Sequence, residues 1–312
     1  LAQMLYNLLA SILRALGNST VPLYFLIFSA LLNIVLDLVL IIAFHMGAAG
    51  AAVATVISQG VSGLLCLLYI ARKVPELRMR REDWRPSGDM LKIQLRIGLP
   101  MALQYSITAI GTMMVQSSLN ILGSTLVAAY TAAGKIEQVI TQAYVAMGTT
   151  IATYSAQNMG AGDVRRIRQG FRSITILGIL YSVIAAAFIM TAGKYMTYLF
   201  VSEDVGVIMD SVDIYLKCIG IFFIPLAVVN IYRNGIQGLG YGFLPMTAGI
   251  AELVGRGAVA VIAAEKRSYT GVCLAGPAAW VLAGSLLLVM YFYIMKKDIK
   301  KIFPENEKEY PN

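Results

Sequence analysis

The chain has 312 residues, of which 58% are hydrophobic and 13% are charged, whereas an average soluble domain has about 45–50% and about 25%. These proportions exclude an ordinary soluble globular domain and indicate a polytopic membrane protein. The net charge of +8 does not indicate nucleic-acid binding, because the basic residues gather at the ends of apolar segments. The three cysteines are far apart and form no metal-binding motif.

Nine apolar segments follow one another along the chain, separated by glycine, proline or charged residues. Most are long enough to cross a hydrocarbon core of about 30 Å. The first is short, as though the chain began inside a helix. The predicted spans are residues 1–15, 21–44, 49–71, 92–120, 124–155, 167–192, 205–236, 240–264 and 270–295. The sequence therefore predicts an all-α polytopic membrane protein.

Lysine and arginine mark one side of the predicted bundle. If the spans alternate in direction, that side holds the basic segments within 72–85, 165–172 and 296–301, together with Arg233. The opposite side holds only Lys194, Lys266 and Arg267. Cytoplasmic loops of membrane proteins carry the excess of Lys and Arg. We therefore expect a multi-pass protein of the plasma membrane with a cytoplasmic C-terminus.

An internal repeat relates the two ends of the chain. Residues 13–25, LRALGNSTVPLYF, match residues 236–248, IQGLGYGFLPMTA, in a Leu-Gly pair followed by proline. At nearly the same offset, residues 46–58 match residues 270–282. Spans one to three thus correspond to spans seven to nine, and spans four to six have no counterpart. This pattern predicts a six-plus-six helix transporter with a pseudo-twofold repeat, of which about three N-terminal helices are missing here.

Five segments carry a resemblance to a known family: RALGNSTVP, LNIVLDLVLI, MGAAGAAVATVISQ, the GLP at 98–100 and AQNMGAGDVRRIRQG at 156–170. In this order they resemble the multidrug and toxic compound extrusion (MATE) transporters, aligned to the family's fourth through twelfth helices. The resemblance implies two six-helix lobes around a central cavity. It divides the chain into a partial N-lobe of three helices at 1–71, a basic cytoplasmic linker at 72–91, a six-helix C-lobe at 92–295 and a cytoplasmic tail at 296–312.

An aspartate stands in the middle of the second span. An Asp at the centre of a membrane helix costs about 2.5–3.5 kcal/mol on insertion scales. Asn33 and Asp37 are spaced i, i+4 and share a helix face, and Thr55 lies on the next span. This hard oxygen set suits Na⁺ or a shared proton, although Asp37 could instead only bond neighbouring helices. The resemblance implies a cation site at Asn33, Asp37 and Thr55, completed by an Asp on the family's first helix, which this chain lacks.

The predicted C-lobe contains several further polar residues. Glu252 and Arg256 are spaced i, i+4, in the favourable order for an ion pair. They could brace the lobe or handle substrate or protons, and the neutral amides could line a cavity or bond across helices. The substrate-cavity candidates are Gln104, Gln116, Asn120, Lys135, Glu137, Gln138, Gln142, Glu252 and Arg256, and Asn230 is a further polar residue. Pro100 and Pro225 are hinge candidates, because proline permits helix bending.

The resemblance implies an antiporter that exchanges organic cations, drugs or amphipathic metabolites for H⁺ or Na⁺ by alternating access. A flippase for lipid-linked oligosaccharides, from the same wider superfamily, is an alternative, and so is a truncated inactive remnant. An enzyme is not expected, because the chain has one histidine and no HExxH motif. We expect no cofactor, no metal beyond a possible Na⁺, small amphipathic substrates and membrane lipid as partners, and a monomer.

Overall fold

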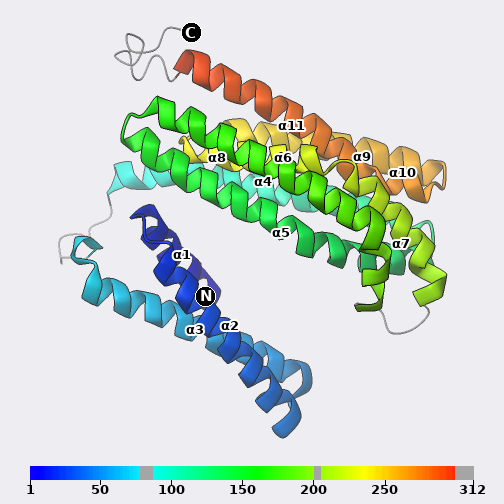
Figure 1. Ribbon diagram of the computed structural model, residues 1–312, viewed down its shortest axis with the longest axis horizontal. Helices are drawn as coiled ribbons and strands as arrows, with labels where there is room; N and C mark the ends of the chain where they lie inside the picture. The colour runs from blue at the N-terminus through cyan, green and yellow to red at the C-terminus, as the bar shows by residue number, and fades with distance from the viewer. Residues whose placement is uncertain (78–86, 200–204, 299–312) are drawn as a thin grey trace. The chain divides into compact units, whose positions relative to one another are not determined.

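The computed structural model describes residues 1–77, 87–199 and 205–298, and every regular element within them is a helix. The α-helices are α1 (Ala2–Ala15), α2 (Thr20–Leu38), α3 (Gly47–Lys73), α4 (Gly88–Asn120), α5 (Ser124–Gly160), α6 (Val164–Ala192), α7 (Val205–Gly220), α8 (Phe223–Gly238), α9 (Phe243–Glu265), α10 (Tyr269–Cys273) and α11 (Ala275–Tyr293). Short π or 3-10 turns follow four of them: η1 (Val39–Ala43), η2 (Pro75–Leu77), η4 (Gly193–Leu199) and η5 (Ile294–Asp298). Contacts divide the chain into an N-terminal unit, Leu1–Gly88, and a C-terminal unit, Asp89–Asn312 (Figure 1).

In the described part of the chain, five helical segments are long and apolar enough to cross a membrane, and a bent pair makes a sixth. They are Thr20–Ala43, Gly47–Lys73, Val164–Tyr198, Phe243–Glu265 and Tyr269–Lys296, with Ile208–Gly220 and Phe223–Gly238 as the pair. The other three predicted spans are also helical but differ in kind. Helix α1 has only 14 residues, whereas α4 and α5 have 33 and 37 residues and a more polar composition. At 1.5 Å per residue, α4 and α5 are roughly 50–55 Å long and exceed the hydrocarbon core.

The predicted span at 205–236 is helical but broken near its middle. Helix α7 ends at Gly220, α8 begins at Phe223, and their axes differ by 54°. Pro225 is the third residue of α8, where a missing N–H costs nothing because first-turn N–H groups have no partner within the helix. Pro100 instead lies inside α4, which continues through it. Of the two hinge candidates, only Pro225 thus lies beside a break in the helix.

In the N-terminal unit, α2 and α3 form an antiparallel hairpin held by small residues. The Ser29 hydroxyl donates to the Ser58 carbonyl at 2.8 Å, and the Ser62 hydroxyl donates to the Phe25 carbonyl at 3.3 Å. A Cβ added at Gly50 would lie 3.1 Å from the Leu40 Cβ, so glycine permits the close approach there. Helix α1 packs on the C-terminal half of α3, with Leu13 and Cys66 in their shared apolar cluster.

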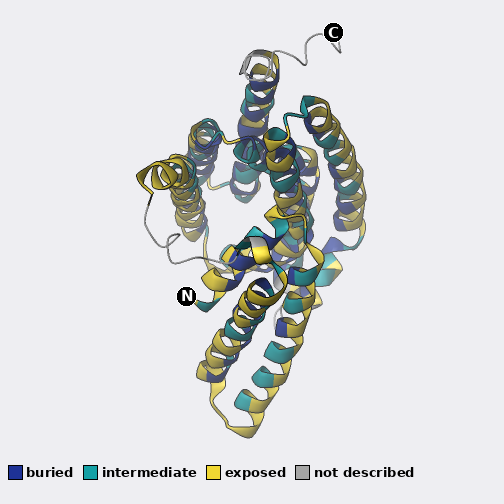
Figure 2. Cartoon of the chain, turned by 90° about the vertical axis from the view of Figure 1, so that its left-hand side faces the viewer, coloured by how far each residue is buried: buried dark blue, intermediate teal, exposed yellow. Residues whose placement is uncertain are grey.

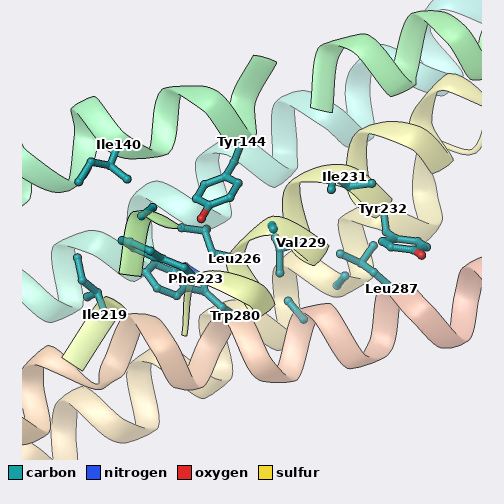
Figure 3. Close-up of a cluster of buried hydrophobic side chains, with 14 of the residues drawn as sticks. Ile140, Tyr144, Ile219, Phe223, Leu226, Val229, Ile231, Tyr232, Trp280 and Leu287 are labelled. Carbon is teal, nitrogen blue, oxygen red and sulfur yellow. The ribbon is translucent and has the colours of Figure 1, made fainter. Parts of the chain in front are cut away.

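The core of the C-terminal unit lies where α5, α6, α7, α8 and α11 meet (Figure 3). Aromatic side chains fill it: Tyr144 from α5 lies 6.1 Å from Phe223 of α8, centroid to centroid. The Tyr144 hydroxyl is 3.0 Å from the Ser182 hydroxyl of α6. The buried polar tip of Tyr144 is thus satisfied inside the apolar core.

Exposed residues run along the helices of both units, as the yellow segments of Figure 2 show. Many of these exposed side chains are large and apolar, as lipid contact requires. On α6 the exposed side chains include Ile176, Leu180, Val183 and Ile184, which recur at helical spacing on one face. A soluble protein rarely exposes so large a contiguous apolar surface. The exposed apolar face therefore agrees with a position against lipid.

Candidate functional site

The first candidate site lies on α2 in the N-terminal unit. Asn33 and Asp37 are one turn apart and partly buried. The Asn33 Nδ2 and Asp37 Oδ1 atoms are shielded from solvent, yet neither has a hydrogen-bond partner within the described residues. An unpaired polar atom in an apolar environment costs about 1–3 kcal/mol by protein mutational data. The region around these atoms can therefore accept a proton, a cation or a further polar side chain.

Thr55 lies on α3 and does not bond to either residue. Its hydroxyl donates to the Ala51 carbonyl of its own helix at 2.9 Å, and its side chain is exposed. The Ser29–Ser58 and Phe25–Ser62 hydrogen bonds fix the register of the hairpin. Moving four residues toward the C-terminus of α2 corresponds to moving four residues toward the N-terminus of α3. At 100° per residue, Asn33, Asp37 and Thr55 then lie on the same side of the α2–α3 pair.

Gln59 is a further polar residue on the same side of the α2–α3 pair, and the sequence analysis did not select it. It follows Thr55 by one helical turn, and its Oε1 atom is buried without a hydrogen-bond partner in the described part of the chain. The same side of α3 carries Gly63, where an added Cβ would lie 3.2 Å from Leu5 of α1. Thr55 and Gln59 therefore lie just past the point where α1 covers α3. The i, i+4 spacing from Thr55 was the signal that could have identified Gln59.

The second candidate site is a cavity of about 220 Å³ inside the C-terminal unit. Six helices contribute to its wall, and the side chains differ in character: hydroxyls, an amide, a carboxylate, a guanidinium, a thiol and three aromatic rings. The lining residues are Thr112, Val115 and Gln116 of α4, Tyr130 and Glu137 of α5, Tyr215 and Ile219 of α7, Arg256 of α9, Cys273 of α10, and Gly276, Pro277 and Trp280 of α11. The cavity thus combines polar groups with aromatic surface.

Glu137 is the carboxylate of this cavity. The Tyr215 hydroxyl donates to Glu137 Oε2 at 2.5 Å, and the Tyr215 ring packs edge-on against Tyr130 with 4.7 Å between centroids. No hydrogen bond reaches Glu137 Oε1 from the residues that the structure describes. Lys135, two residues away, is exposed and faces another direction. Of these two candidates, only Glu137 lines the cavity.

Glu252 joins two arginines in a buried network beside the cavity. Arg256 Nη2 donates to Glu252 Oε1 at 2.7 Å, which confirms the predicted pair, and Arg233 Nη2 donates to Glu252 Oε2 at 2.5 Å. Glu252 is 4% exposed and Arg256 is 8% exposed. Arg233, predicted to follow the seventh span, lies within α8, and its charge is paired inside the bundle.

Three of the remaining candidates, Gln104, Gln116 and Asn120, form hydrogen bonds between side-chain amides. The Gln237 Nε2 atom donates to Gln104 Oε1 at 3.0 Å, so buried Gln104 bonds α4 to α8. The Gln116 Nε2 atom donates to Asn120 Oδ1 at 3.1 Å on an exposed face of α4. The remaining three side chains do not reach the cavity wall: Gln138 and Gln142 are exposed, and Asn230 donates to the Leu226 carbonyl of its own helix.

The apolar helices and the charges paired inside them define the chain as a multi-pass membrane protein. The MatE family model matches residues 97–262, more than half of the chain. The chain therefore belongs to the MATE family of transporters, and the resemblance in its sequence motifs is confirmed. Members of this family are transporters and not enzymes.

The chain is also similar to individual proteins. The probable multidrug resistance protein YpnP of Bacillus subtilis is 36% identical over 233 residues, which cover 74% of this chain and 51% of that protein. The multidrug export protein MepA of Staphylococcus haemolyticus is 23% identical over 261 residues, covering 84% and 54%. The chain thus spans about half the length of these curated relatives.

Solved structures support the same fold. A mutant of the Vibrio cholerae MATE transporter VcmN matches with a TM-score of 0.86 at 20% identity, covering 94% of this chain and 67% of that one. Within the described residues, no three His, Cys, Asp or Glu side chains group closely enough to hold a metal ion.

Proposed function

We propose that this protein is a cation-coupled antiporter that exports organic cations, drugs or amphipathic metabolites across the plasma membrane. Its coupling ion is H⁺ or Na⁺, its C-terminus is cytoplasmic, and it works as a monomer by alternating access. Family membership and the multidrug resistance names of its relatives support this proposal. The proposal concerns the full-length protein, because the chain spans only about half of those relatives.

The proposal rests mainly on the polar side chains of α2 that have no hydrogen-bond partner among the described residues. Asp37 lies in an apolar helix, and its Oδ1 atom is buried with no hydrogen-bond partner among the described residues. Burying an ionised carboxylate without a partner is costly, so the site favours either protonation or a bound cation. The nearby amide oxygens of Asn33 and Gln59 are hard ligands that suit Na⁺. Opening this site alternately to the two sides of the membrane would couple ion flow to export.

The lipid-linked oligosaccharide flippase has less support from the arrangement of cations. Binding a pyrophosphate needs several unpaired Arg or Lys side chains near one another. Within the described spans, Arg233 and Arg256 share Glu252, and Lys217 pairs with Asp213 at 2.5 Å. Each of these three cations therefore already has an ion-pair partner, which leaves it less available to a pyrophosphate.

The experiment is an Asp37→Asn substitution in the full-length protein, reconstituted in liposomes. We expect ion-driven export of a fluorescent cation such as ethidium to fall to the level of empty liposomes, because the amide of Asn neither takes up a proton nor supplies a negative charge for Na⁺. Imposing a proton gradient and a sodium gradient separately on the unchanged protein identifies the coupling ion.

The matched control is Asp210→Asn, which removes an exposed carboxylate of α7. Its export rate should equal that of the unchanged protein. Export by the Asp37→Asn protein at an unchanged rate under either gradient would contradict the proposed cation site. Correct folding of each variant is checked by its melting temperature in detergent.

A further inference from the structure

The cavity of the C-terminal unit presents two opposite charges to one small volume. Glu137 Oε1 has no hydrogen-bond donor among the described residues. The Arg256 guanidinium is 8% exposed and donates to Glu252 through Nη2. Both residues line the cavity of about 220 Å³. Each of the two charged groups thus retains a position for one more hydrogen bond.

We propose that this cavity binds a small zwitterion, a molecule with one ammonium group and one carboxylate. The ammonium group lies against Glu137 Oε1, and the carboxylate lies against the Arg256 guanidinium, which lines the same cavity. Nothing in the cation-coupled export proposed above requires this site, and its test does not involve Asp37.

The charges around the cavity favour a ligand with no net charge. Arg233 and Arg256 contribute two positive charges, and Glu252 and Glu137 contribute two negative charges, so the four groups cancel. A lone cation or a lone anion would leave one uncompensated charge in a low-dielectric interior, which is costly. A zwitterion satisfies both free positions and leaves the total charge at zero.

Size and aromatic surface narrow the ligand class further. Drug-sized ligands occupy pockets of roughly 300–1,000 Å³, and this cavity is smaller. The rings of Tyr130, Tyr215 and Trp280 line the same wall as Glu137. Aromatic faces attract ammonium and quaternary ammonium groups. The cavity therefore suits a compact amino acid or betaine and excludes large planar drugs.

The test measures binding of matched probes to the full-length protein in detergent by equilibrium dialysis. The zwitterionic probes are glycine betaine and γ-aminobutyrate. Their anionic counterparts are tert-butylacetate and valerate, and their cationic counterparts are choline and pentylammonium. We expect at least one zwitterion to bind about tenfold more tightly than both of its singly charged counterparts, as one charge-assisted hydrogen bond allows.

Two substitutions should change the preferred charge in opposite directions. Glu137→Gln leaves one excess positive charge, so the anionic counterpart should become the best ligand. Arg256→Gln leaves one excess negative charge, so the cationic counterpart should become the best ligand. Glu252 keeps Arg233 as a partner in the second variant, and Glu137 has no ion pair to lose in the first.

Asp213→Asn is the control, because it removes a carboxylate of α7 that pairs with Lys217 and does not line the cavity. Its ligand preference should equal that of the unchanged protein. The proposal is overturned if neither zwitterion binds saturably, if a singly charged probe binds as tightly as its zwitterion, or if Glu137→Gln leaves the preference unchanged. The Glu137→Gln result stands by itself if Arg256→Gln fails to fold.

Discussion

At the scale of single residues, Glu252 is the shared partner of two arginines in the C-terminal unit. It is 4% exposed and holds two guanidinium groups, one on each carboxylate oxygen. Its loss would leave two buried cations without their ion-pair partner. Removing one partner from a buried ion pair typically costs about 3–5 kcal/mol, because the other charge stays buried and unpaired.

We therefore expect Glu252→Gln to lower the free energy of unfolding by about 3 kcal/mol or more. Arg256→Gln should cost less, because Glu252 still pairs with Arg233. Thermal unfolding in detergent measures both variants. Equal melting temperatures for the two variants would contradict the central role assigned to Glu252.

The sequence was informative about residue contacts only where both partners share a helix. The Glu252–Arg256 ion pair and the Gln116–Asn120 hydrogen bond follow from i, i+4 spacing. The Glu137–Tyr215 and Arg233–Glu252 contacts each join two helices, so periodicity along one helix does not contain them. Arg233 also looked like a residue of the membrane surface, because its partner lies 19 positions further along the chain.

At the scale of the helices, the close crossing of α5 and α8 depends on glycine. A Cβ added at Gly238 would lie 2.3 Å from the Ala152 carbonyl oxygen, a contact that backbone atoms cannot relieve by a rotamer change. The two helices would have to move apart. Overpacking of this kind usually costs about 1–3 kcal/mol.

Gly238→Ala should therefore lower the melting temperature clearly. Gly98→Ala is the matched substitution, because nothing lies within 4 Å of a Cβ added at Gly98 in the middle of α4. Alanine is the better helix former by roughly 0.8–1.0 kcal/mol, so this variant should be neutral or stabilised. A Gly238→Ala protein as stable as Gly98→Ala would show that the helices do not pack this closely.

Helix breaks were harder to predict than helices. All nine predicted spans are helical in the described residues, because apolar length is a strong signal. The 54° bend between α7 and α8 was not predicted, because the apolar run continues through Ile221 and Phe222. Pro225 lies three residues after the bend. A proline in the first turn of a helix does not reveal whether the chain before it bends or continues straight.

At the scale of the whole molecule, orientation in the membrane is the property most open to a direct test. The basic segments within 72–85, 165–172 and 296–301 predict a cytoplasmic C-terminus even without Arg233, which no longer counts. Residues 78–86 and 299–312 lie outside the described residues, so this prediction rests on sequence alone there.

We expect alkaline phosphatase fused after Asn312 in a bacterial host to be inactive, because the enzyme needs an extracytoplasmic location to fold. The same reporter fused after Arg267, in the turn between α9 and α10, should be active. Green fluorescent protein fused at the same two positions should show the opposite pattern, with fluorescence after Asn312 and none after Arg267. Active phosphatase at the C-terminus would reverse the proposed orientation.

The balanced charges of Arg233, Arg256, Glu252 and Glu137 also bear on how the transporter responds to the membrane voltage. Moving one elementary charge across the membrane potential changes the energy by about 2.3 kcal/mol per 100 mV. Four groups that sum to zero can move together through the field without electrical work. Once Glu137 takes up a proton, the same movement carries one positive charge, so protonation would turn a voltage-independent step into an electrogenic one.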